Sequence, residues 1–332
     1  MTSITSPITF TPFKLSPHGM WGGMAAMAEA TKAAEDLGYH SINLPEHIIL
    51  PHKPTDPALT DETWYDNFVL AAHLATLTNR IRFTFFTLIV PYRPPIQTAK
   101  QLATLDVLSQ GRITLGTGVG WLEGEFDLLG VPFEKRGAMT DEYLQAFRAL
   151  WTEDHPAFHG EFVSFANARF EPKPVQAPHI PIWIGGMGPA ARRRAVQYGA
   201  GWMPLGSGRP GSSAFRDAAG EVTLIKQMLA AAGRDPDDFR FAFSLSIGEQ
   251  RPYTPHPTPH PTAADRMGSQ TLKGAATEPE PLGFDAPRII DDLGKLREAG
   301  FNHIFARLGF TTPAELIQNM EWFAANVMPT FK

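Results

Sequence analysis

Short apolar segments alternate with helical segments along most of this chain, and this alternation restricts its fold more than any other feature. Eight segments have the composition of strands, and apolar residues at helical spacing follow them. The expected strands are Ile8–Leu15, Ser41–Leu44, Ile81–Val90, Ile113–Leu115, Ile180–Ile184, Gly201–Leu205, Phe239–Ile247 and His303–Leu308. The expected helices are Met24–Leu37, Thr63–Thr78, Pro95–Ser109, Thr140–Trp151, Ala190–Tyr198, Ser212–Ala232, Arg288–Ala299 and a last one after the capping box Thr312–Glu315. Eight β–α units predict an α/β fold, a (β/α)8 TIM barrel with insertions in a single domain, residues 1–332.

A doubly wound parallel sheet is the competing architecture. It would have fewer strands and a phosphate-binding fingerprint after the first strand, which this sequence lacks.

Two segments interrupt the alternation of strands and helices. His159–Pro174 alternates like a small hairpin, which predicts an insertion near residues 155–175. Residues 251–287, which contain RPYTPHPTPHPT, are too rich in proline for a core element, so we expect a loop or lid excursion there.

Composition excludes several functional classes. The net charge is −5, so the chain has no basic field to hold nucleic acid or an anionic membrane. There is no cysteine, which excludes disulfides and thiolate chemistry. No HExxH or comparable spacing predicts a metal site, and no apolar run is long enough to cross a membrane. The first residues, MTSITSPITF, do not read as a signal peptide, so the expected location is cytoplasmic.

In a barrel of this kind the active site lies at the carboxyl ends of the strands. The second expected strand ends in Glu46 and His47. Imidazole titrates near neutral pH, which makes His47 the strongest candidate for a general acid or base. Glu46 could orient the ring or raise its pKa. A purely structural histidine is the alternative.

Two glycine-rich turns follow strands. After Ile113–Leu115 come Gly116, Gly118 and Gly120, whose bare face would let a flat ring approach the backbone, although GxGxG is not the dinucleotide fingerprint. After Ile180–Ile184 comes GGMGP, where backbone N–H groups and a helix N-terminus could bind a phosphate. Turns that bind nothing are the alternative in both cases.

Three further side chains belong to the same ends of strands. Arg93 and Arg307 could pair with an anionic group of a substrate or cofactor, and ion-paired or solvated arginines are the alternative, preferred for Arg307. Trp121 could stack on a ring or plug the mouth of the barrel.

Taken together, several segments resemble the bacterial-luciferase-like family of flavin- and deazaflavin-dependent oxidoreductases. They are LPEHIILP, NRIRFTFFTLIVPYRPPIQTAKQLATLDVLSQGRITLGTGVGWLEGEF, GVPFEKRGAMTDEYLQAFRALW and FEPKPVQAPHIPIWIGGMGPAARRRAVQYGAGWMPL. The resemblance implies a (β/α)8 barrel, usually dimeric, that holds FMN or coenzyme F420 across the strand ends with the phosphate after strand five. The sequence is most similar to the F420-dependent subgroup, in which a histidine at the position of His47 donates a proton after an acidic residue at Glu46.

The resemblance also implies a cofactor site. A bulge that supports the central ring, often with a non-proline cis peptide, would fall near Phe86–Thr87. The full expected set for the cofactor is Phe86, Thr87, Gly118, Gly120, Trp121, Gly185, Gly186, Met187, Gly188 and Ala190. Two features depart from the family pattern, since the bulge carries bulky residues and Trp121 replaces a glutamate found in some F420-dependent dehydrogenases.

Three functions remain open at this point. The first is an F420-dependent oxidoreductase that transfers a hydride to or from a small organic substrate. The second is an FMN-dependent monooxygenase that uses reduced flavin and O2, for which an aromatic pocket of Phe85, Phe86 and Trp121 would be suitable. The third is a barrel that binds the cofactor without catalysis. The expected assembly is a homodimer, and the substrate is not encoded in any readable motif.

Overall fold

A parallel sheet forms the centre of the molecule and is nearly closed into a barrel. The computed structural model describes residues 7–12, 23–52, 64–204, 206–248 and 283–332. The barrel strands are β1 (Thr9–Thr11), β2 (Ser41–Leu44), β3 (Arg82–Phe85), β5 (Ile113–Gly118), β8 (Ile182–Gly185), β9 (Gly201–Met203), β10 (Arg240–Ile247) and β11 (His303–Leu308). Their order is β1-β11-β10-β9-β8-β5-β3-β2, so each strand lies beside its neighbours in sequence. The backbone N–H of His40 donates to the carbonyl of Phe10 at 2.9 Å and brings β2 back to β1. The predicted TIM barrel is confirmed.

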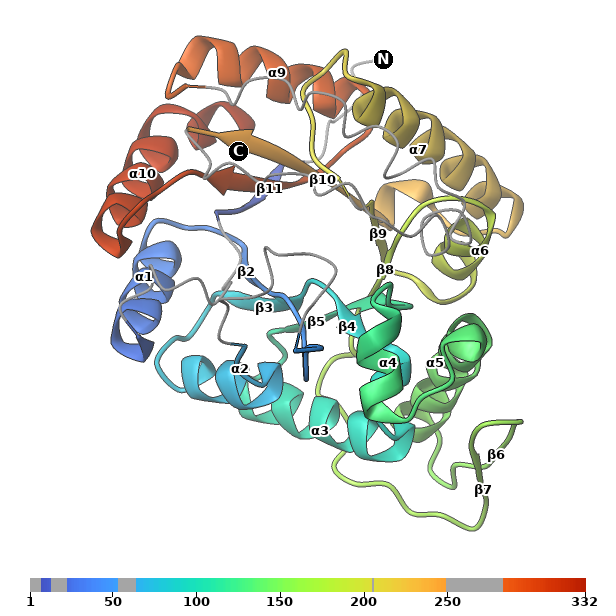
Figure 1. Cartoon of the computed structure of the whole chain (residues 1–332). Helices are drawn as coiled ribbons and strands as arrows, with labels where there is room; N and C mark the ends of the chain where they lie inside the picture. Colours follow the sequence, from blue (N-terminus) through green and yellow to red (C-terminus); the bar gives the residue numbers. More distant parts are fainter. Residues whose placement is uncertain (1–6, 13–22, 53–63, 205, 249–282) are drawn as a thin grey trace.

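Helices surround this sheet on the outside (Figure 1). The helices are α1 (Met24–Asp36), α2 (Asn67–Ala75), α3 (Pro95–Leu108), α4 (Glu123–Leu129), α5 (Arg136–Thr152), α6 (Pro189–Tyr198), α7 (Ser213–Ala231), α9 (Ala286–Glu298) and α10 (Pro313–Asn326). Short 3-10 turns are η2 (Val90–Tyr92), η3 (Phe133–Lys135), η4 (Pro236–Asp238) and η6 (Met328–Phe331). The predicted hairpin is confirmed as an antiparallel pair, β6 (Phe158–His159) with β7 (Ser164–Phe165).

Side-chain caps decide where several helices begin. The carboxylate of Asp66 accepts the N–H groups of Phe68 and Val69 at 2.9 and 3.0 Å, so α2 begins at Asn67. The Thr312 hydroxyl caps α10 by accepting the N–H of Glu315 at 3.2 Å, as predicted. The carboxylate of Glu315 accepts hydrogen bonds from the hydroxyl and the backbone N–H of Thr311, each at 2.6 Å, and these hydrogen bonds, that of the hydroxyl first, hold its pKa below the ordinary value.

Several predicted boundaries were wrong, among them the following three. The run Ile81–Val90 is not one strand, because a cis peptide between Phe86 and Thr87 separates β3 from β4 (Leu88–Ile89), which pairs with β5. Helix α5 begins at Arg136 instead of Thr140. Helix α9 begins at Ala286, inside the predicted excursion over 251–287. Residues 251–282 of that excursion lie outside the described residues.

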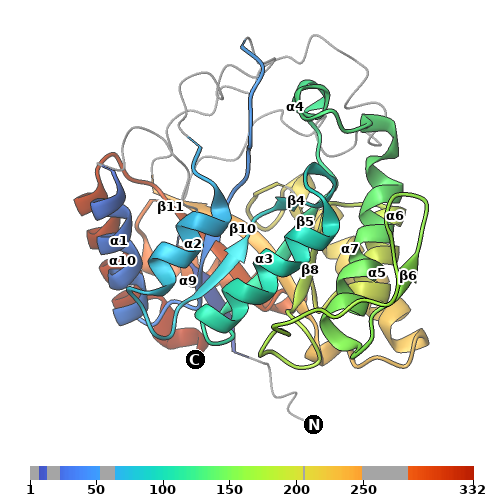
Figure 2. The same ribbon diagram turned by 90° about the horizontal axis from the view of Figure 1, so that it is seen from below.

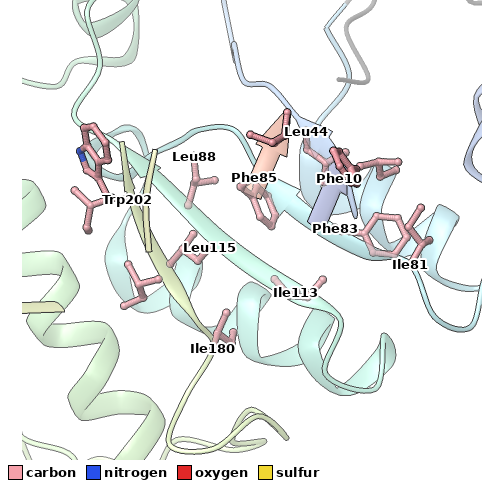
Figure 3. Packing of buried hydrophobic residues seen from close by; sticks show 14 of the residues in the cluster. Phe10, Leu44, Ile81, Phe83, Phe85, Leu88, Ile113, Leu115, Ile180 and Trp202 are labelled. Atoms are coloured by element: carbon pink, nitrogen blue, oxygen red, sulfur yellow. The ribbon is translucent and has the colours of Figure 1, made fainter. Parts of the chain in front are cut away.

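The main hydrophobic core fills the space between the strands and the helices. Side chains that alternate along each strand supply it, such as Phe83 and Phe85 of β3 and Ile113 and Leu115 of β5 (Figure 3). The opposite faces of the strands point into the barrel. There Trp183 packs with Met203, Ala242 and Phe305 in a smaller cluster.

Two histidines lie at the amino ends of β2 and β11, opposite the expected active site. The His303 ring is fully buried, contacts the Thr9 and Thr11 hydroxyls at 2.6 and 3.0 Å, and meets the His40 ring edge-on at 5.2 Å. Burial, with smaller effects from Arg82 and Arg240, lowers the pKa of His40 from 6.5 to about 4. Burial likewise lowers the pKa of His303 well below its ordinary value.

This pair predicts that the fold becomes less stable in mild acid. The unfolded chain takes up protons at histidine below about pH 6.5, whereas the folded chain keeps both rings neutral, so stability falls as pH drops from 6.5 toward 4. We expect His40 alone to account for a loss of about 2 kcal/mol in the free energy of unfolding between pH 7.5 and pH 5. Urea titrations at the two pH values measure this, and His40→Gln should lose less than the parent. An equal loss in both proteins would contradict the prediction.

Candidate active site

The carboxyl ends of the strands gather the predicted site residues at one mouth of the barrel. Helix α4, which follows β5, and the segment after β2 rise above the same end of the barrel, and the carboxyl terminus lies at the other end (Figure 2). The side chain of Thr87 lies against Gly118 and against Gly185, and it would be 3.1 Å from a Cβ at Gly185. His47 bonds to Glu125 of α4. The turn after β2, the turn after β5 and the turn after β8 therefore converge.

His47 is held in place from three sides. Its Nδ1 lies 2.7 Å from Oε2 of Glu125. Its ring meets the edge of the Trp64 ring at 4.6 Å between centroids and that of Trp121 at 6.3 Å. The side chain is 11% exposed. Because Nδ1 is occupied by Glu125, Nε2 is the ring nitrogen that can meet a bound molecule.

Glu125 belongs to the candidate site through its contact with His47, and the sequence did not predict it. Its side chain is fully buried and accepts four hydrogen bonds, one of them from His47. The other donors are the Ile48 N–H at 2.7 Å, the Ile49 N–H at 3.3 Å and the Tyr92 hydroxyl at 2.9 Å. Burial first, then the Glu125 charge, raises the pKa of Tyr92 and keeps it a donor. The sequence indicated only an acidic first turn of a helix after a strand. Glu123 lies in the same turn, so this pattern does not single out Glu125.

Glu46 does not orient His47, so that part of the prediction was wrong. Both of its carboxylate oxygens are occupied by other donors, namely Arg93 Nη1 at 2.6 Å and the N–H of Ile89 at 2.6 Å. Burial raises the pKa of Glu46, and the neighbouring Arg93 opposes that shift. Through these two contacts Glu46 connects the end of β2 to Ile89 in β4 and to Arg93, which follows η2.

The two arginines have protein partners. Arg93 also contacts Asp66 at 3.4 Å and stacks over the ring of Phe68 at 5.2 Å, which corresponds to the ion-paired alternative. On β11, Nη1 of Arg307 donates to the Ser207 hydroxyl at 3.1 Å. A role of either arginine toward a substrate stays a prediction.

The glycines in and just after β5 allow close packing against neighbouring segments, and the side on which a Cβ would stand is not open. A Cβ at Gly116 would collide with the Phe85 carbonyl oxygen, and one at Gly118 with the Thr87 hydroxyl. Gly120 has φ +84°, and its Cβ would lie 2.6 Å from the Phe126 ring. The side chains missing at these glycines therefore leave no open space, because the chain's own atoms fill it. Contact of a cofactor with Gly118, Gly120 or Trp121 stays a prediction.

The turn after β8 has the geometry of an anion site. Gly186 and Gly188 have φ of +104° and +88°, and no atom lies within 4 Å of a Cβ placed on Gly188. Helix α6 begins directly afterwards without a side-chain cap, so the N–H groups of Ala190 and Ala191 have no capping partner there. Ala190 is exposed and Met187 half-buried. Backbone donors at a helix N-terminus fit a phosphate.

The cis peptide forms the floor of the mouth. Its predicted position at Phe86–Thr87 is confirmed. Both residues are half-buried, and the Phe86 ring packs edge-on against Phe305 at 4.6 Å. The indole N–H of Trp64 is buried and has no hydrogen-bond partner among the described residues, so it is available to a bound molecule.

The described residues contain neither a metal-binding cluster nor a helix that could span a membrane. No group of three or more histidine, aspartate or glutamate side chains in those ranges is arranged to hold a metal ion. None of the described helices combines the length and apolar character needed to cross a membrane.

Comparison with known proteins gives consistent similarities. A family model described as luciferase-like monooxygenase matches residues 7–248. An uncharacterised protein of Mycobacterium tuberculosis is 40% identical over 189 residues, which cover 54% of this chain and 64% of that relative, less than two thirds of its length. An FMNH2-dependent dimethylsulfone monooxygenase of Pseudomonas putida is 28% identical over 239 residues, 69% of this chain and 63% of that protein.

Solved structures share the fold. The monooxygenase RslO1 from Streptomyces bottropensis superposes with a TM-score of 0.75 at 20% identity, covering 98% of this chain and 100% of its own. An F420-dependent secondary alcohol dehydrogenase superposes with a TM-score of 0.74 at 18% identity, covering 98% and 99%. A monooxygenase and an F420-dependent dehydrogenase thus both have this fold.

Proposed function

Because this chain belongs to the luciferase-like monooxygenase family of oxidoreductases, we propose that it is an F420-dependent enzyme acting on a small organic substrate. A hydride would pass between the deazaflavin and the substrate, and His47 would move the accompanying proton. The observation that carries this proposal is the placement of His47 at the barrel mouth, where its Nδ1 is held by Glu125 and its ring lies between Trp64 and Trp121.

The residues at the mouth fit a phosphorylated planar cofactor. The open turn at Gly186–Gly188 and the uncapped start of α6 would hold a phosphate. Phe86 and Thr87 would support the ring from the barrel floor. When bound, F420 would supply the site that donates or accepts a hydride.

His47 would act through Nε2. A group that gains a hydride needs a proton on the adjacent heteroatom, and in the reverse direction a base must remove it. Trp64 and Trp121 pack edge-to-face with the His47 ring, which is 11% exposed, and would limit the access of water. A proton held at Nε2 is then delivered to the substrate without loss to solvent.

An FMN-dependent monooxygenase is the second candidate. The sequence similarity to the dimethylsulfone monooxygenase, over 69% of the chain, favours it. Phe86, Trp64 and Trp121 would protect a reactive site from water in that reaction, whereas Phe85 is fully buried in the main core and does not contribute.

Titration of the purified protein with F420 and, separately, with FMN distinguishes the two candidates. Tryptophan emission reports binding, because Trp64 and Trp121 lie at the mouth. We expect F420 to quench emission at lower concentration than FMN. Tighter binding of FMN would favour the monooxygenase, and binding of neither would contradict both.

A glycine substitution tests the phosphate turn. Gly188→Ala should weaken cofactor binding about tenfold or more, because a side chain enters the open turn and disfavours its positive φ. Gly233→Ala is the matched control: φ there is +72°, no atom lies within 4 Å, and the position follows α7 at the far end of the barrel. Gly188→Ala should lose about 1–3 kcal/mol of stability, since φ +88° with ψ −178° is essentially restricted to glycine, and Gly233→Ala about 1 kcal/mol. Equal cofactor affinity in both would exclude the turn from the site.

A further inference from the structure

We propose that Glu125 is a positioning residue that fixes the tautomer and the orientation of His47. The inference rests on the proposed function for its catalytic consequence, but the arrangement itself can be measured in the protein without cofactor. Its basis is a buried carboxylate whose oxygens are divided between the ring of His47 and the backbone beside it.

The two carboxylate oxygens of Glu125 have different partners, and this arrangement determines which ring nitrogen of His47 carries hydrogen. Oε1 of Glu125 accepts the N–H groups of Ile48 and Ile49, and Oε2 accepts the Tyr92 hydroxyl. A carboxylate only accepts hydrogen bonds, so Nδ1 of His47, 2.7 Å from Oε2, must be the donor. In the neutral ring Nε2 then carries the lone pair. In the charged ring Nε2 carries the hydrogen that can leave.

The same carboxylate also fixes where the ring points. Ile48 and Ile49 directly follow His47, so Glu125 holds both the ring and the backbone of one turn against α4. Trp64 blocks rotation of the ring from another side. When Nε2 transfers its proton, the N–H bond breaks, an O–H or other heteroatom–H bond forms on the substrate, and the electron pair stays on Nε2. The Nδ1–H bond to Glu125 persists, so nothing else must rearrange.

A purely structural role is the alternative, in which Glu125 only attaches residues 47–49 to α4. The Glu125→Gln variant distinguishes the positioning role from the purely structural role. The glutamine oxygen must stay on the two backbone N–H groups, which turns its NH2 group toward His47. Nδ1 then has to accept, and the ring is driven into the tautomer with hydrogen on Nε2, which cannot take a proton from a substrate.

The test is 15N NMR of the His47 ring in unliganded protein at a pH where the ring is neutral. We expect hydrogen on Nδ1 in the parent and on Nε2 in Glu125→Gln. Glu142→Gln is the matched control. Glu125 accepts two backbone N–H groups, and Glu142 accepts three, from Glu161, Phe162 and Val163, without contacting His47. It should leave the His47 tautomer unchanged.

Turnover separates this inference from the proposed function. If His47 moves the proton, kcat of Glu125→Gln should fall at least about 10²-fold while cofactor binding changes less than threefold. A reversed tautomer with unchanged kcat would support the positioning role and overturn the proton-transfer role of His47. A parent ring with hydrogen on Nε2, or an unchanged tautomer in folded Glu125→Gln, would overturn the inference.

Discussion

Replacement of His47 by alanine is expected to lower turnover at least about 10²-fold while cofactor binding is retained. The reason is that Nε2 of His47 is the ring nitrogen proposed to move the proton, whereas the backbone of the turn after β8 is proposed to hold the phosphate. Steady-state kinetics with F420 and a panel of small organic substrates measure kcat, and tryptophan emission measures affinity.

A second variant makes the His47 prediction specific. His47→Gln keeps a polar group of similar length that can still donate to Glu125 but cannot transfer a proton near neutral pH. It should therefore be as slow as the alanine variant although its packing between Trp64 and Trp121 is better preserved. Turnover within threefold of the parent in either variant would remove His47 from the mechanism.

Replacement of Glu46 by alanine is expected to cost about 3 kcal/mol in the free energy of unfolding. The Glu46 side chain is 2% exposed and that of Arg93 is 15% exposed, so the substitution leaves a largely buried guanidinium without its main partner. It also leaves the N–H of Ile89 unsatisfied at the start of the mouth. Urea denaturation followed by circular dichroism gives the difference.

The control for Glu46 is an exposed ion pair. Lys135 and Glu161 lie 3.1 Å apart with side chains that are 54% and 65% exposed, so Glu161→Ala should change stability by less than about 1 kcal/mol. A double variant of Glu46 and Arg93 to apolar residues should recover part of the loss. If Glu46→Ala were as mild as Glu161→Ala, the buried pair would not stabilise this end of the barrel.

Local patterns in the sequence predicted most of the fold. The strand bounds Ser41–Leu44 and His303–Leu308 were predicted correctly, because compact apolar runs end at distinct residues there. The run Ile81–Val90 was misread as one strand, since a change of peptide geometry at Phe86–Thr87 leaves the apolar pattern uninterrupted. Only the resemblance to a family placed a cis peptide at that point.

The site was predictable where function sits at a strand end and unpredictable where it depends on contacts between distant segments. His47 follows β2 directly, and the barrel rule was enough to find it. Its partner Glu125 is 78 positions away and Trp64 lies in a different segment, so no spacing connects them. The glycines of β5 were misjudged for a related reason, because neighbouring strands decide whether the space beside a glycine is open or filled.

The central claim is that three turns from different parts of the chain bind one cofactor at a single mouth of the barrel. Hydrogen–deuterium exchange with and without F420 tests this most directly. We predict slower exchange on binding in all three turns, at residues 46–49, 118–125 and 185–191, and no change at the far end, at residues 231–240. Protection of only one turn, or protection at the far end, would contradict the account.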